Sequence, residues 1–106
     1  MPKYLFVANY SPEGIQGVLS EGGTGRRSAI QQLAESVGGT LESFYYAFGG
    51  DDAFVMCDLP DDEAAAALAM TVSASGKAAV RTTKLLTAEQ IDAATKRSPA
   101  YRPPGG

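Results

Sequence analysis

Hydrophobic residues recur at every second position in some segments of the chain and at the three-to-four-residue spacing of a helix in others. Runs of β-branched and aromatic residues predict strands, whereas apolar residues at i, i+3 and i+4 predict amphipathic helices. The expected strands span residues 3–10, 40–48, 52–59 and 79–86. The expected helices span about residues 12–21, 24–37, 63–74 and 87–96.

Residues with capping chemistry stand at several of these boundaries. Ser11 and Pro12 suit the N-cap and the first position of a helix. Gly38 suits a left-handed helix end, and the segment from Thr87 to Gln90 has the spacing of a capping box. Residues 61–63 are acidic and start a helix, where its macrodipole favours negative charge, so we expect no further role for them.

The predicted element order is β-α-β-β-α-β, with a second helix after the first strand and a short helix after the last. This order is typical of the ferredoxin-like fold, an α+β sandwich in which helices cover one face of a four-stranded antiparallel sheet. The short segment 49–51 joins the two middle strands as a hairpin. We expect one domain, residues 1–96, followed by a mobile tail rich in proline and glycine, residues 97–106.

Both faces of the predicted sheet are largely apolar. In the first strand, alternation places Tyr4, Phe6 and Ala8 on one face and Leu5, Val7 and Asn9 on the other. In the second strand it separates Leu41, Tyr45 and Ala47 from Phe44, Tyr46 and Phe48. In the third strand it separates Val55, Cys57 and Leu59 from Phe54 and Met56. A face in water would carry polar residues. We therefore expect a second copy to cover the helix-free face, in a homodimer or a larger oligomer that contains it. The alternative is that the C-terminal segment folds over this face.

Charge and composition exclude several function classes. The formal net charge is −3 and no dense basic surface is evident, which argues against nucleic-acid and anionic-membrane partners. No apolar run approaches the roughly 20 residues that span a bilayer. The chain has no histidine and one cysteine, Cys57, so His-dependent triads and zinc sites are excluded, and we expect no metal and no cofactor. A single cysteine, expected as an inert core thiol, fits a cytoplasmic protein.

Two groups of residues are candidates for binding. An aromatic cavity on the sheet would use residues that combine apolar surface with polar groups: Asn9, Tyr10, Tyr46, Phe48 and Arg81. The alternative is ordinary core and dimer packing. A glycine-rich corner, residues 22–28, leads into a helix N-terminus and would hold an anion with Gly23, Thr24, Arg26 and Arg27. This corner lacks the Gly-Lys-Ser/Thr ending of a phosphate-binding loop. The alternative to an anion site is a corner between two helices, with Thr24 as a cap and both arginines in solvent.

Asp51 and Asp52 are the remaining carboxylate pair near a turn. Adjacent strand residues point to opposite faces, so we expect these carboxylates to diverge, with Asp52 capping backbone groups.

Four stretches of the chain resemble the GYD-domain family. They read KYLFVANYSPEGI, RRSAIQQLAESVGGTLESFYYAFG, DLPDDEAAAALAM and SASGKAAVRTTKLLTAEQ, and the resemblance covers about residues 2–92. In the motif that names the family, Gly49 and Asp52 match, and Asp51 stands where tyrosine is usual. The resemblance implies a dimeric α/β-barrel type of ferredoxin-like fold. The family is largely without an assigned activity.

Three functions follow from these observations. The first is a non-catalytic oligomeric module that binds a small hydrophobic or aromatic molecule. The second is a cofactor-independent monooxygenase or isomerase, which would need Tyr10 or Tyr46 within hydrogen-bond reach of Asn9 or Arg81. The third is an anion or nucleotide sensor that uses residues 22–28.

Overall fold

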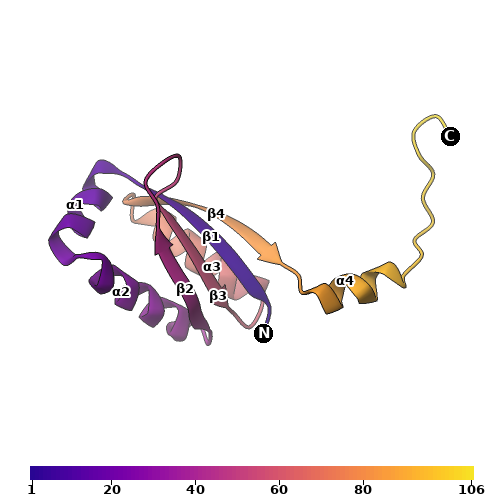
Figure 1. The fold of residues 1–106 in the computed structure, drawn as a ribbon, viewed down its shortest axis with the longest axis horizontal. Helices are drawn as coiled ribbons and strands as arrows, with labels where there is room; N and C mark the ends of the chain where they lie inside the picture. Colours follow the sequence, from indigo (N-terminus) through magenta and orange to yellow (C-terminus); the bar gives the residue numbers. More distant parts are fainter.

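The computed structural model describes residues 1–106 and contains one antiparallel sheet (Figure 1). The sheet order is β2-β3-β1-β4. The strands are β1 (Lys3–Tyr10), β2 (Thr40–Tyr46), β3 (Ala53–Asp58) and β4 (Ala78–Leu85). The helices are α1 (Pro12–Glu21), α2 (Gly23–Ser36), α3 (Asp62–Ala74) and α4 (Ala88–Thr95). The ferredoxin-like α+β fold that the element order predicts is therefore confirmed.

Most element boundaries lie within two residues of their predicted positions. Ser11 caps α1 by accepting a hydrogen bond from the Gly14 amide, and α4 begins with the predicted capping box at Thr87. The start of α2 differs, because its N-cap is Gly22 at φ 81° and no side chain caps it. Thr24 therefore does not cap this helix.

A β-bulge changes which face of the sheet Leu41 occupies. Leu41 pairs with Cys57 and Phe44 pairs with Val55, and the register shifts between residues 41 and 43. Because Cys57 and Val55 share a face, Leu41 lies on the same face as Phe44. The predicted opposition of Leu41 and Phe44 is wrong, since simple alternation does not allow for the extra residue.

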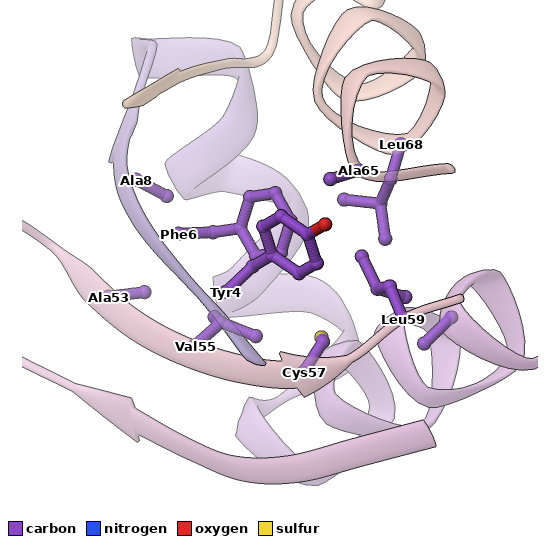
Figure 2. Close-up of a cluster of buried hydrophobic side chains, with 10 residues drawn as sticks. Tyr4, Phe6, Ala8, Ala53, Val55, Cys57, Leu59, Ala65 and Leu68 are labelled. Atoms are coloured by element: carbon purple, nitrogen blue, oxygen red, sulfur yellow. The ribbon is translucent and has the colours of Figure 1, made fainter. Parts of the chain in front are cut away.

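The core lies between the sheet and helices α2 and α3. Figure 2 shows side chains of β1 and β3 that point toward side chains of α3. The buried cluster consists of Tyr4, Phe6, Ala8, Ala34, Ala53, Val55, Cys57, Leu59, Ala65 and Leu68. Cys57 is fully buried, as predicted, and burial raises the pKa of its thiol to about 11. The small alanine side chains let the helices approach the sheet closely.

The two main helices cover opposite edges of the sheet. Helix α2 packs on the edge strand β2, and α3 packs on the other edge strand, β4. The central strands β1 and β3 therefore lie beneath the space between the two helices. Helix α1 contacts α2 and the end of β1.

The C-terminal segment leads away from the sheet. Figure 1 shows α4 and the residues after it extending beyond the end of β4, and every residue from Leu86 to Gly106 is exposed. The radius of gyration is 16.9 Å, above the roughly 13 Å of a compact domain of this size. The segment thus does not fold over the helix-free face. None of the helices combines the length and the apolar character that crossing a bilayer requires.

Candidate ligand-binding cleft

A cleft of about 370 Å³ opens between α2 and α3 at the Tyr10 end of β1. Its walls come from α1, α2 and α3, and the first residues of β4 close one side. The apolar and small wall residues are Gly14, Gly17, Ala29, Ile30, Leu33 and Val72. The cleft exists because the helices lie over the edge strands and leave the sheet's centre uncovered here.

The cleft continues into a smaller recess of about 40 Å³ against the sheet. Five residues line both spaces: Tyr10, Arg26, Ile30, Val72 and Ala78. The recess is otherwise apolar, with lining from Phe6, Ala8, Phe44, Val55, Cys57, Leu68 and Val80. A molecule that enters the cleft would therefore place its inner end on aromatic and aliphatic side chains.

Tyr10 and Arg26 are the polar residues that line both spaces, and Tyr46 lies beside them. The Tyr46 hydroxyl donates a hydrogen bond to the Gly23 carbonyl at 3.1 Å. Burial raises the pKa of both tyrosines, and the nearby Arg26 charge partly offsets the shift. Both phenols are therefore neutral at pH 7 and act as hydrogen-bond donors. Neither is a base at that pH.

Of the four residues predicted to bind an anion at the glycine-rich corner, Arg26 lines the cleft and the other three do not. Arg26 lies one turn into α2 and borders the cleft, whereas the next residue, Arg27, is exposed. Gly23 packs under the Tyr46 ring, since an added Cβ would stand 3.1 Å from that ring. Thr24 is exposed. Of the four predicted anion ligands, only Arg26 thus lines the cleft.

Asn9 and Arg81 lie together, but on the helix-free face. Asn9 Nδ2 donates to Asp51 Oδ1 at 2.9 Å, and Arg81 Nη2 donates to both Asp51 oxygens at 3.2 Å. The sheet separates this cluster from Tyr10 and Tyr46. The predicted Phe48 is fully exposed in the connection between β2 and β3. Of the five residues expected in an aromatic cavity, only Tyr10 therefore lines the cleft, with Tyr46 beside it.

The family-motif residues Gly49 and Asp52 belong to the same connection. Asp52 Oδ2 accepts a hydrogen bond from the Tyr10 amide at 2.8 Å, and the Asp52 amide donates to the Ala8 carbonyl at 2.9 Å. Asp52 thus fixes the end of β1, where Tyr10 enters the cleft, and its carboxylate diverges from that of Asp51. Gly49 is exposed, and a Cβ added to it would have no other atom within 4 Å.

Sequence reasoning missed the helical walls of the cleft. The helical spacing predicts Ile30 and Leu33 as core residues on one face, and they do face the sheet, but they border open space. Gly17 gives the only signal along the chain, because a residue without a side chain on α1 leaves open space beside the helix.

Comparisons with known proteins give a family and a distantly similar solved structure. No curated protein matches the chain. Among solved structures, the chain is similar to a protein of unknown function from Nitrosomonas europaea, at 18% sequence identity and a TM-score of 0.44. That alignment covers 94% of this chain and 96% of the other.

The GYD domain family matches residues 4–95, from β1 to the end of α4. The matched span contains the whole sheet, the three helices that wall the cleft and the Asp52 anchor. This chain belongs to the GYD domain family.

Proposed function

We propose that this protein binds a small hydrophobic or aromatic molecule in the cleft between α2 and α3, and that it does not transform that molecule. The observation that carries this proposal is the continuity of the open cleft with an apolar recess on the sheet. A volume of about 370 Å³ lies within the range of small-molecule sites, about 300–1,000 Å³. Apolar walls with a few polar groups at one border are also typical of such sites.

The polar groups of the cleft support binding over catalysis. The enzyme alternative needs a tyrosine beside Asn9 or Arg81, and the sheet separates these groups. The tyrosines are neutral at pH 7, and Glu21, the one carboxylate in the lining of the cleft, does not line the recess. No general base thus faces the recess, which removes the support for a monooxygenase or isomerase.

A cleft-filling substitution tests the proposal. In Gly17→Phe the new side chain has room at the helix surface, because nothing lies within 4 Å of an added Cβ, and it projects into the cleft. Gln16→Phe is the matched control, since Gln16 is exposed on the same helix and outside the cleft lining. The probe is N-phenyl-1-naphthylamine, an uncharged dye that fluoresces in apolar surroundings.

We expect the dye to bind the wild-type protein and Gln16→Phe saturably, with equal affinity. Gly17→Phe should weaken binding by about tenfold or more, because the aromatic ring occupies the volume that the dye needs. Equal binding to both variants, or no saturable binding to the wild-type protein, would show that the cleft is not the site.

We further propose that a second copy of the chain covers the helix-free face. The centre of this face is apolar and includes Leu5, Val7, Phe54 and Met56, with Tyr45 beside them. Tyr45 is 70% exposed and Phe54 is 39% exposed, so large aromatic surfaces meet water in the single chain. Exposure of such an apolar surface to water is unfavourable in free energy unless a partner covers it.

Charged groups border this apolar centre at both ends. At one end Lys3 pairs with Glu42 and Asp58, and at the other end Arg81 pairs with Asp51. An apolar centre within a polar rim is the usual anatomy of a protein interface. Because the charges are already paired within the chain, contact with a second copy need not leave a charge unpaired.

A further inference from the structure

We propose that the ligand of this cleft is a hydrophobic carboxylate, whose carboxyl group binds Arg26 while its apolar body lies in the cleft with one end against the apolar recess. This inference rests on the proposed binding function and names its ligand class. It starts from the position of one guanidinium group at the border between solvent and an apolar space.

Arg26 lines both the outer cleft and the inner recess, so it is within reach of a ligand that occupies the cleft and extends to the recess. Its side chain is 30% exposed, and the rest is enclosed by the cleft walls. An arginine at such a border can contact a ligand's charged end without requiring that charge to enter the apolar recess.

Within the protein this guanidinium has two polar neighbours, Glu21 and the Tyr10 hydroxyl. Its ion-pair partner is Glu21, with Arg26 Nη1 3.6 Å from Glu21 Oε2, and the Glu21 side chain is 48% exposed. An ion pair of this length between partly exposed groups contributes little to stability. Because a guanidinium carries five N–H donors in a planar fork that matches a carboxylate, Arg26 retains donors for a ligand.

The neighbouring groups also favour an anionic end on the ligand. The hydroxyl of Tyr10 is neutral at pH 7, since burial raises its pKa, and it can donate a hydrogen bond to an oxygen beside Arg26. Lys77 adds a second cation to the lining, against the single carboxylate of Glu21. The lining is thus locally positive in a chain whose formal net charge is −3, so the whole molecule's charge does not explain it.

A matched pair of ligands tests this inference separately from the proposed function. 2-Naphthoate and 2-naphthamide have the same ring system and nearly the same shape, and differ in the charge of the end group. Their affinities are measured by displacement of N-phenyl-1-naphthylamine at low ionic strength. The variants are Arg26→Gln and Arg26→Lys, and the control is Arg27→Gln, which removes the adjacent exposed arginine.

We expect the wild-type protein and Arg27→Gln to bind naphthoate about tenfold or more tightly than naphthamide. Arg26→Gln should abolish this preference and leave naphthamide binding unchanged, which also shows that the variant is folded. Arg26→Lys should retain part of it. Equal affinity of the wild-type protein for both molecules, or a preference that persists in Arg26→Gln, would overturn the carboxylate inference and leave the binding function standing. Failure of both molecules to displace the bound dye would overturn the carboxylate inference, whereas the absence of saturable dye binding would overturn the binding function as well.

Discussion

Asp62 connects the start of α3 to two strands through its carboxylate. Its Oδ1 accepts a hydrogen bond from the Tyr4 hydroxyl at 2.6 Å and lies 3.0 Å from Lys84 Nζ. The expectation that the acidic residues 61–63 only start a helix is therefore incomplete. Asp61 does cap α3, by accepting from the Ala64 amide, but Asp62 reaches the sheet.

This contact predicts a specific acid sensitivity. The Tyr4 hydrogen bond, and then Lys84, lower the pKa of Asp62 from its ordinary value of 3.8, and the same contact raises the pKa of Tyr4 to about 12. A lowered folded-state pKa stabilises the fold above the unfolded value, and this stability is lost as pH falls through the folded value. We expect urea midpoints of the wild-type protein to fall more steeply below about pH 4 than those of Asp62→Asn or Tyr4→Phe. Parallel curves for all three proteins would contradict the assignment.

Asp52 makes a second testable contact at the residue scale. Asp52→Ala removes the acceptor of the Tyr10 amide and leaves that donor without its partner. Hydrogen bonds to charged groups contribute about 1.5–3 kcal/mol, so we expect a destabilisation of about 2 kcal/mol in urea unfolding. Asp92→Ala is the control, because Asp92 is exposed on α4. A loss no larger than that of the control would show that Asp52 does not anchor the strand.

Alternation explains which candidate residues can share a site. Asn9 and Tyr10 are neighbours on one strand and must face opposite sides of the sheet, so the sequence alone already excludes a pocket that holds both side chains. The face that Arg81 occupies cannot be deduced in this way, because it depends on the register between β4 and β1, which pairs Arg81 with Val7. The wrong face predicted for Leu41 has a different cause, because the β-bulge between residues 41 and 43 shifts the alternation and has no sequence signature here.

At the scale of elements, the approach of α1 to the residue that precedes β4 depends on one glycine. Gly14 is buried, and a Cβ added there would lie 2.0 Å from the Lys77 carbonyl oxygen. We expect Gly14→Ala to destabilise the fold by about 2 kcal/mol, because the helix must shift. Gly17→Ala, on the same helix with open space around it, should stabilise the fold by roughly 0.5–1 kcal/mol. Thermal unfolding of both variants checks this, and equal effects would contradict the packing described here.

Helix starts show what local chemistry can and cannot predict. Ser11 and Thr87 are side-chain caps, and the sequence located both. The start of α2 instead depends on Gly22, whose φ of 81° lets the chain turn sharply between two helices. A rule that looks for a side-chain oxygen selects Thr24, whereas the backbone turn decides the boundary.

At the scale of the whole molecule, the cleft could not be predicted from the sequence. It results from the distance between α2 and α3, which the packing of several small core residues sets together. The pattern of apolar positions places Ile30 and Leu33 on the apolar face of a helix, but it does not indicate whether they touch other side chains or open space. The fold was predictable because element order and alternation are properties of the chain itself.

The uncovered face predicts the state of association. We expect sedimentation equilibrium to give twice the chain mass of 11.0 kDa. Phe54→Lys should yield the single-chain mass at the same concentration, because it places a charge in the apolar centre. Tyr101→Lys is the control, since Tyr101 is exposed in the C-terminal tail, and this variant should remain paired. A wild-type protein that stays at 11.0 kDa at high concentration would refute the interface.

The most direct test of ligand binding in the cleft is a methyl NMR titration with 2-naphthoate. The methyl groups of Ile30, Val72 and Val80 line the cleft or its recess, whereas those of Leu5, Val7 and Met56 lie on the opposite face of the sheet. We predict saturable shifts in the first three signals and none in the last three. Shifts confined to the helix-free face, or no shifts at all, would contradict the account.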